Sequence, residues 1–162
     1  MSRLDSFIRR LEAQRACLDH AAALIGGLDG VVLELGLGNG RTYDHLRELL
    51  PGRDIYVCER QVAAHPDCIP PAERLLLGDL RDTLPRARAG LAGKVAFAHL
   101  DVGTGDAAAN RALAGDLAPL VAPLLREDGV LASDQMMDCP KFASLPLPDG
   151  VARGRYHLYR RV

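Results

Sequence analysis

Residues 31–43, VVLELGLGNGRTY, decide how this 162-residue chain folds. The first five, residues 31–35, are apolar apart from one glutamate, which predicts a short strand buried on both faces. Residues 41–50 carry apolar side chains at the three- and four-residue spacing of a helix. The stretch therefore predicts a buried strand that runs through a short loop directly into a helix.

The loop has a glycine at every second position, Gly36, Gly38 and Gly40. Without a Cβ atom, glycine permits a tight turn with positive φ and lets backbone N–H groups approach a ligand closely. The start of the following helix adds further unpaired N–H donors. We interpret the loop as a nucleotide cradle and expect Glu34, at the strand end, to face the same crevice. The alternative is a strand-to-helix turn that is glycine-rich for structural reasons alone.

The glycine spacing separates two groups of enzymes. A dinucleotide-binding fingerprint, G-x-G-x-x-G, would need its third glycine at position 41, where this chain has Arg41. The pattern present, E-x-G-x-G-x-G, resembles the first motif of the class I S-adenosylmethionine-dependent methyltransferases. In that family the loop wraps the methionine end of the cofactor. The resemblance implies cofactor contacts from Glu34, Gly36, Leu37, Gly38, Asn39, Gly40, Thr42 and Tyr43.

Composition limits the partners that we expect. The net charge is −1 and 48% of the residues are hydrophobic, so no overall basic field attracts nucleic acid or an anionic membrane. We therefore expect a small-molecule substrate and neither a nucleic-acid nor a membrane partner, and we leave a homo-oligomer open. The amino terminus lacks a signal-peptide core, and four cysteines without a C-x-x-C pair predict free thiols. Together these features predict a cytoplasmic protein.

The chain reads as a single methyltransferase-like domain, residues 1–162. We expect residues 1–27 to form an N-terminal helical extension and residues 28–162 to form a Rossmann-like core. Residues 3–25 lack Pro and Gly and repeat apolar side chains at helical spacing. Basic side chains along this helix predict a solvated face rather than a substrate site: Arg9, Arg10, Arg15 and His20.

Strand and helix patterns alternate after the glycine loop, which predicts an α/β fold with a mostly parallel sheet in a Rossmann-like three-layer sandwich. The resemblance implies the strand order 3-2-1-4-5 plus a C-terminal antiparallel strand, for which residues 155–161 are the candidate. Residues 136–150 are rich in proline and predict irregular chain with a helical turn at 142–144, so we expect the last hairpin to be trimmed. The other predicted strands are residues 54–58, 74–77, 94–100 and 130–134.

Further candidates for cofactor binding stand at the ends of the second and third strands. Glu59 lies 19 residues beyond Gly40, where an acid can accept hydrogen bonds from both ribose hydroxyls. Arg60 beside it either stacks on the adenine or lies in solvent. The resemblance implies that Asp79, with Gly78 and Leu80, meets the adenine, whereas aspartate is also favoured as the N-cap of the next helix.

Two aspartates are the catalytic candidates. The resemblance places the end of the fourth strand nearest the transferable methyl group, so Asp101 is expected both to contact the cofactor and to take part in catalysis. Asp134 ends the fifth strand. With Gln135 these aspartates are similar in position to the metal ligands of catechol-type O-methyltransferases, but glutamine replaces the asparagine of that set. We expect no metal site, and we expect His99 to be a hydrogen-bonded core histidine.

The combined pattern predicts an S-adenosylmethionine-dependent methyltransferase that transfers a methyl group to a small-molecule acceptor and releases S-adenosylhomocysteine. An alternative is a non-catalytic S-adenosylmethionine-binding sensor or subunit, which would keep the loop and lack an acceptor site. An NAD-dependent dehydrogenase is less favoured, because Arg41 interrupts the glycine fingerprint and the chain is too short for a second domain.

Overall fold

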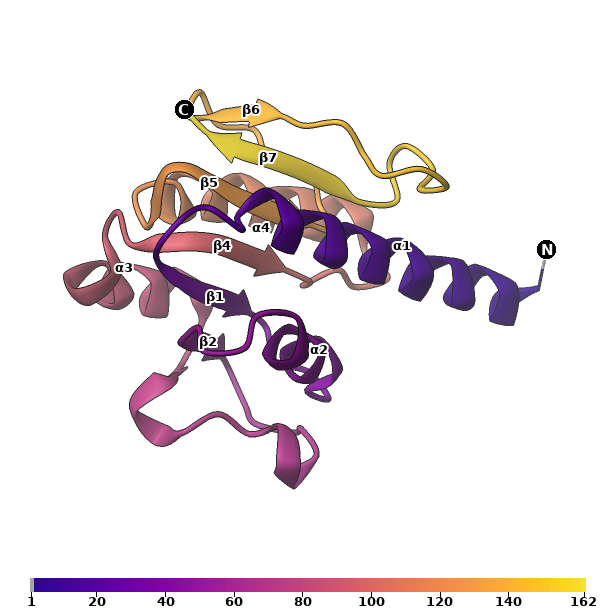
Figure 1. The fold of residues 1–162 in the computed structure, drawn as a ribbon. Coiled ribbons are helices and arrows are strands. Elements are labelled where there is room, and N and C mark those ends of the chain that lie inside the picture. The colour runs from indigo at the N-terminus through magenta and orange to yellow at the C-terminus, as the bar shows by residue number, and fades with distance from the viewer. Residues whose placement is uncertain (1) are drawn as a thin grey trace.

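A computed structural model describes residues 2–162 of the chain. Its centre is a seven-stranded sheet in the order β3-β2-β1-β4-β5-β7-β6 (Figure 1). The first five strands in this order are parallel to one another, and β7 is antiparallel to both β5 and β6. The predicted strand order is therefore confirmed. The strands are β1 (Val31–Leu35), β2 (Ile55–Glu59), β3 (Leu75–Leu77), β4 (Val95–Leu100), β5 (Leu125–Ser133), β6 (Phe142–Ser144) and β7 (His157–Arg161).

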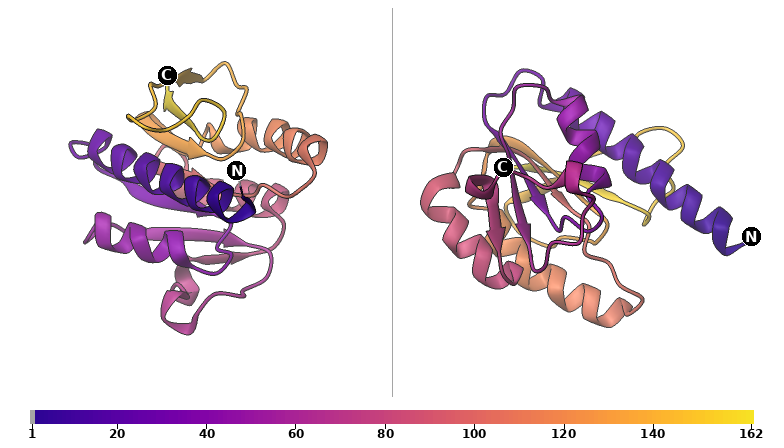
Figure 2. Two further views of the ribbon diagram at one scale, coloured as in Figure 1. Left: turned by 90° about the vertical axis from the view of Figure 1, so that its right-hand side faces the viewer. Right: turned by 90° about the horizontal axis from the view of Figure 1, so that it is seen from below.

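Helices cover both faces of the sheet, so the architecture is the predicted three-layer sandwich (Figure 2). Two helices pack on one face, and their apolar side chains share a buried cluster with Val32 and Phe97. The other two pack on the opposite face with Leu33 and Leu35. The first pair is α1 (Arg3–Leu24) and α2 (Arg41–Leu49), and the second pair is α3 (Leu80–Leu91) and α4 (Ala107–Val121).

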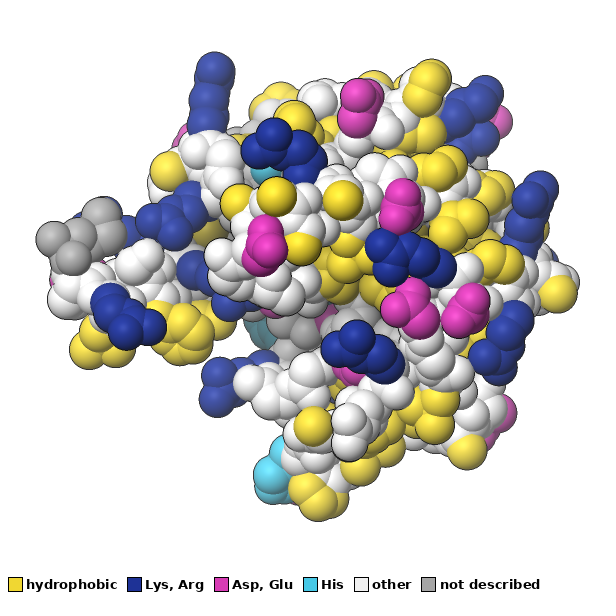
Figure 3. All heavy atoms as spheres, turned by 180° about the vertical axis from the view of Figure 1, so that it is seen from behind, with side chains coloured by type: hydrophobic (Ala, Val, Ile, Leu, Met, Phe, Trp, Pro, Cys, Tyr) yellow, Lys and Arg dark blue, Asp and Glu magenta, His cyan; other side chains and the backbone are white. Residues whose placement is uncertain are grey.

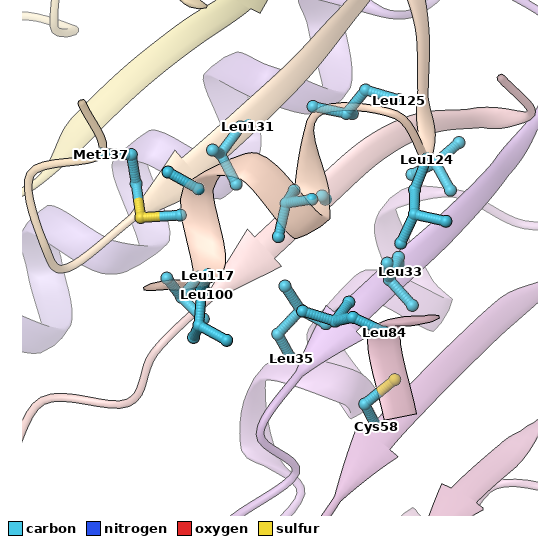
Figure 4. Close-up of a cluster of buried hydrophobic side chains, with 14 of the residues drawn as sticks. Leu33, Leu35, Cys58, Leu84, Leu100, Leu117, Leu124, Leu125, Leu131 and Met137 are labelled. Atoms are coloured by element: carbon cyan, nitrogen blue, oxygen red, sulfur yellow. The ribbon is translucent and has the colours of Figure 1, made fainter. Parts of the chain in front are cut away.

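The core lies on both faces of the sheet, because successive side chains of each strand point to opposite faces and helices cover both. All six residues of β4, the central strand beside β1, are buried. Leucine side chains from β1, β4 and β5 meet those of α3 and α4 in the cluster shown in Figure 4. Parallel strands buried on both faces require such continuous apolar runs.

The amino-terminal end of helix α1 extends beyond the carboxyl ends of the central strands (Figure 1). A capping box starts it: the Ser2 hydroxyl accepts the Asp5 backbone N–H, and the Asp5 carboxylate accepts the Ser2 backbone N–H, each at 3.0 Å. The exposed fractions of Leu4 and Phe7 are 66% and 47%, so the first turns keep apolar side chains in solvent. Hydrophobic and basic side chains lie together at this projecting end (Figure 3).

The carboxyl-terminal segment differs from the prediction. Residues 142–144 form a short strand, β6, and not a helical turn, so the hairpin expected to be trimmed is present. Phe142 pairs with Arg161 across the hairpin, and its ring lies 5.7 Å from the ring of Tyr159. Local sequence did not show this strand, because three residues carry little periodicity and their pairing partner lies near the end of the chain.

Two further observations complete the fold. The connection between β2 and β3 contains two short 3₁₀ turns, η1 (Pro66–Cys68) and η2 (Ala72–Arg74). In the part of the chain that the structure describes, none of the helices combines the length and apolar character needed to cross a bilayer.

The packing of α2 gives a first prediction. Leu46 is completely buried, so Leu46→Ala should lower the free energy of unfolding by about 2–5 kcal/mol through lost burial and a residual cavity. Urea denaturation measures this change. Leu4→Ala is the matched control and should change the free energy by no more than about 0.5 kcal/mol, because its side chain is exposed. Equal effects of the two changes would contradict this packing.

Candidate functional site

Two adjoining cavities lie at the carboxyl ends of the parallel strands, on either side of the glycine loop. We call the first the strand-end cavity: it has a volume of about 350 Å³ and extends along the ends of β2 and β4 to the start of α3. The second, the helix-side cavity, has about 230 Å³ and lies between the loop and α1. Gly36, Gly38 and Asp101 line both cavities. The crevice therefore lies where strand order reverses between β1 and β4, as ligand sites of open parallel sheets do.

A larger groove lies elsewhere and lacks these features. It measures about 620 Å³ and lies between α1 and residues 149–155. No strand end and no part of the glycine loop lines it, so volume alone does not identify the site.

The loop glycines have positive φ angles for different reasons. Gly38, at φ 52°, has open space where a Cβ atom would stand. Gly40, at φ 86°, is the N-cap of α2, and a Cβ atom there would lie 2.4 Å from the Cβ of Cys68. Gly38 therefore leaves room on the crevice side, whereas Gly40 permits close packing of the loop against the connection that follows β2.

Glu59 binds the backbone of the glycine loop. One carboxylate oxygen accepts the N–H groups of Leu37 and Gly38, at 2.6 and 3.0 Å. The other accepts those of Arg60 and Gln61, at 2.6 and 3.1 Å. Burial alone would raise the pKa of Glu59, but these four donors hold the pKa below its ordinary value. The carboxylate is thus ionised, fixed at the end of β2 and exposed to the strand-end cavity.

Asp79 is the N-cap of α3, which is one of the two roles predicted for it. Its side chain accepts the backbone N–H of Arg81 at 2.9 Å. It also lines the strand-end cavity, together with Leu80 and Arg60. The two roles are compatible, because the start of α3 lies at the same edge of the sheet.

Glu34 does not face the crevice as expected. Its side chain is completely buried and lines neither cavity. One carboxylate oxygen accepts the hydroxyl of Thr42, and the other lies 2.8 Å from Nδ1 of His99. The side chain points into the face of the sheet that α1 and α2 cover, and it contacts Thr42, a residue of the helix-side cavity at the start of α2. The expectation that Glu34 faces the crevice is therefore wrong.

His99 is the hydrogen-bonded core histidine that the sequence predicted. Its Nε2 lies 2.5 Å from the hydroxyl oxygen of Tyr156, and its Nδ1 contacts Glu34. Burial would lower the pKa of His99, but the neighbouring Glu34 carboxylate outweighs it, and the pKa is raised. Because both ring nitrogens have protein partners and the side chain is completely buried, His99 cannot reach a substrate.

Asp101 joins the two cavities and binds α1. Its Oδ1 lies 2.6 Å from Nη2 of Arg10, and its Oδ2 accepts Nε2–H of Gln14 at 2.7 Å. The same amide lies 3.4 Å from the hydroxyl of Tyr156. Sequence reasoning missed both α1 residues: it assigned Arg10 to a solvated face and did not single out Gln14. A polar Gln14 among buried residues of an amphipathic stripe was the available signal.

Asp134 accepts hydrogen bonds from the loop that follows β4. Its carboxylate accepts the backbone N–H groups of Val102 and Gly103, at 3.3 and 2.8 Å, and the side-chain amide of Gln135 at 3.0 Å. Burial, and to a lesser degree the charge of Asp101, raises its pKa. Asp134 lines neither cavity, so this structure gives it a role in shaping the loop.

Across residues 2–162, no three His, Cys, Asp or Glu side chains are grouped as a metal site requires. Metal-independent cofactor binding stays a prediction.

Most of the predicted cofactor residues meet in the crevice. Gly40 and Tyr43 do not, because Gly40 packs on Cys68 and Tyr43 is buried under the Arg47 guanidinium. Gly78 precedes the lining residues without being one of them. Those that line the two cavities are Gly36, Leu37, Gly38, Asn39, Thr42, Glu59, Arg60, Asp79, Leu80 and Asp101.

Comparison with known families agrees with this geometry. The family model for S-adenosyl-L-methionine methyltransferase matches residues 1–161. The chain belongs to this family. The cofactor is therefore S-adenosylmethionine, and the fold is that of the class I methyltransferases. No curated protein is similar enough to count as a match.

One solved structure agrees with this family at high identity, and more distant structures share the fold. An S-adenosyl-L-methionine methyl transferase from Silicibacter pomeroyi DSS-3 is 47% identical, with a TM-score of 0.95, over 100% of this chain and 99% of that one. An RNA methyltransferase from Salinibacter ruber, solved with S-adenosyl-L-homocysteine, is 17% identical, with a TM-score of 0.51 and coverage of 89% and 88%. TrmN from Thermus thermophilus is 19% identical, with a TM-score of 0.57 and coverage of 88% and 48%.

These neighbours correct the expected partners. The Salinibacter ruber protein is an RNA methyltransferase on the same fold, so the exclusion of nucleic acid was wrong. The inference failed because net charge describes the whole chain and not one surface. The groove between α1 and residues 149–155, for example, is lined by three arginines and two acids although the total charge of the chain is −1.

The His99 environment predicts proton-linked stability. With a raised pKa, the folded chain holds the proton on His99 more tightly than the unfolded chain does. That contribution is full below the unfolded pKa, about 6.5, and is lost as pH rises through the folded pKa. The free energy of unfolding, relative to His99→Gln, should therefore fall as pH rises above about 6.5. Urea denaturation of both proteins over a pH series measures this; a difference that is flat or grows with pH would contradict it.

The two loop glycines should respond differently to alanine. Both substitutions place a Cβ atom at positive φ, which costs about 1–2 kcal/mol. Gly40→Ala also brings that atom against Cys68, so its loss in free energy of unfolding should be clearly the larger. Thermal or urea denaturation compares the two variants. Equal losses would show that the close packing at Gly40 is not maintained in solution.

Proposed function

We propose that this protein transfers the methyl group of S-adenosylmethionine to a nucleophile that enters beside Asp101, with S-adenosylhomocysteine as the second product. The observation that carries the proposal is the arrangement of the two cavities, which meet at Asp101 under the glycine loop. The cofactor supplies an electrophilic methyl group on a positively charged sulfur. In the transfer, a nucleophile lone pair forms the new bond to carbon while the carbon–sulfur bond breaks and sulfur keeps its electrons.

The strand-end cavity fits the adenosine half of the cofactor. Glu59 supplies an ionised carboxylate for the vicinal ribose hydroxyls. Leu80 and Leu113 supply an apolar wall for a planar base, and Asp79 supplies an acceptor for an exocyclic amine. Since Glu59 already accepts four backbone N–H groups, ribose binding requires it to share these bonds, which couples the loop to the ligand.

Asp101 is the residue best placed to assist the acceptor. Its side chain is 21% exposed, lines both cavities and stands at the end of β4. A carboxylate within hydrogen-bond reach can orient a hydroxyl or amine and take its proton as the bond to carbon forms. The main requirement of methyl transfer, alignment of donor and acceptor, is met by the fixed loop on one side and α1 on the other.

The non-catalytic alternative would lack an acceptor site. The last hairpin, which the sequence predicted to be trimmed, is present, since β6 pairs with β7 beside β5. The segment that was expected to be lost is thus available to complete the substrate side of the sheet.

The function is tested with a radiolabelled methyl group. Protein and labelled S-adenosylmethionine are incubated with two acceptor pools, total RNA and a set of small-molecule hydroxyls and amines. Transfer to either pool, reduced in Asp101→Asn, supports catalysis and identifies the acceptor class. Cofactor binding without transfer to either pool would contradict catalysis and favour a sensor.

Cofactor binding gives a separate prediction at Glu59. Glu59→Gln removes the charge that holds the ribose, so the dissociation constant for S-adenosylhomocysteine should rise about 10- to 100-fold, the equivalent of about 1.4–3 kcal/mol. Isothermal titration calorimetry measures it. Glu73→Gln, in η2, is the control and should bind like the parent. Unchanged affinity in Glu59→Gln would remove Glu59 from the ribose site.

A further inference from the structure

Gln14 is a buried amide on α1, with an exposed fraction of 6%. The other residues that α1 buries are alanines, a cysteine and a leucine, so the amide interrupts an otherwise apolar stripe. A buried amide costs free energy unless it is hydrogen-bonded. Its Nε2 lies 2.7 Å from Oδ2 of Asp101 and 3.4 Å from the hydroxyl oxygen of Tyr156. The amide is therefore directed at the end of β4 and not at its own helix.

The orientation of the Gln14 amide is fixed by these two partners. The amide nitrogen carries two hydrogens, one for each acceptor. The Tyr156 hydroxyl also contacts Nε2 of His99 at 2.5 Å, and Nδ1 of His99 is paired with Glu34. Whether Tyr156 donates to Nε2 or accepts from it, the Tyr156 oxygen keeps a lone pair for Gln14. An amide turned the other way would place its oxygen against the Asp101 carboxylate, and two acceptors repel each other. Gln14 thus presents an N–H donor to Asp101.

The two oxygens of Asp101 are held in different ways. Oδ1 forms an ion pair with Arg10, whose side chain is 39% exposed, and an ion pair with this exposure contributes little. Oδ2 is held by the buried amide of Gln14. An N–H donor favours the ionised form of a carboxylate, and the ionised form still has lone pairs available for a further proton. The contact with Gln14 therefore fixes the position of Asp101 and favours the form that accepts a proton.

We propose that Gln14 is a positioning residue for the transfer step, which acts by orienting the Asp101 carboxylate toward the acceptor. As the nucleophile's lone pair bonds to the methyl carbon, the carbon–sulfur bond breaks, sulfur keeps its electrons, and the nucleophile's proton passes to Asp101. Gln14 neither gains nor loses a proton in this step. The inference rests on the proposed function, because it needs Asp101 to act on the acceptor. It gives α1 a part in the rate of transfer and not in binding at the strand-end cavity.

The test is a double-mutant cycle in the methyl-transfer assay, with labelled S-adenosylmethionine and the same two acceptor pools. Gln14→Met keeps the length of the side chain and removes the amide, so kcat should fall about 10- to 100-fold through misplacement of Asp101. The KM for S-adenosylmethionine should stay within about twofold of the parent value. In the Asp101→Asn background the same substitution should have little further effect, because residues that act through one another are not additive.

Two further variants separate positioning from general damage to α1. Tyr156→Phe removes only the hydroxyl that holds the second amide hydrogen, so it should lower kcat less than Gln14→Met does, and this loss should also disappear in Asp101→Asn. It provides the second measurement if Gln14→Met is poorly folded by urea denaturation. Leu18→Ala removes a buried apolar side chain from the same helix. Any loss of transfer that it causes should be equal in the parent and Asp101→Asn backgrounds.

The inference is overturned if Gln14→Met and Tyr156→Phe transfer like the parent, or if their losses are undiminished in Asp101→Asn. In either case, transfer by the parent that depends on Asp101 leaves the proposed function standing. A loss in Gln14→Met without one in Asp101→Asn would also overturn it. If the parent transfers to neither pool, the proposed function is wrong and the role of Gln14 falls with it.

Discussion

The buried carboxylate of Glu34 is the constraint on which the site depends. A charge at the end of a central, fully covered strand is costly unless it is paired and hydrogen-bonded. Thr42 from the start of α2 and His99 from β4 satisfy its two oxygens. Because these partners come from different elements, the carboxylate fixes the glycine loop, α2 and β4 relative to one another.

The same contacts extend to both ends of the chain. His99 reaches Tyr156, just before β7, and Tyr156 reaches Gln14 of α1. Gln14 and Arg10 then return to Asp101, at the mouth of the crevice. A network of buried polar groups is stabilising only when all of its members are satisfied, which ties the helix, the carboxyl-terminal strand and the cofactor loop into one unit. The crevice is thus bordered by segments that are far apart in sequence and are joined by side chains.

The sequence predicted what depends on local pattern. Parallel strands present their carboxyl ends at one edge, so the acids that follow them line the crevice. Glu59 was predicted from its spacing after the glycine loop, and Asp79 and Asp101 from the resemblance to the methyltransferases. The core role of His99 followed from its place in a buried strand. Positions that depend on partners distant in sequence were not predictable in this way. In the sequence, Arg10 has the pattern of an exposed helical arginine, and only the fold brings it to Asp101. Glu34 has the position of a ligand-binding residue, but in the structure its carboxylate is paired with His99 and Thr42.

A crystal structure of the protein with S-adenosylhomocysteine tests the central claim most directly, since it locates both ends of the ligand in one measurement. The account predicts the ribose hydroxyls within hydrogen-bond distance of the Glu59 carboxylate and the thioether beside Asp101, along the glycine loop. Ligand density in the groove between α1 and residues 149–155, or a ribose bound away from Glu59, would contradict it.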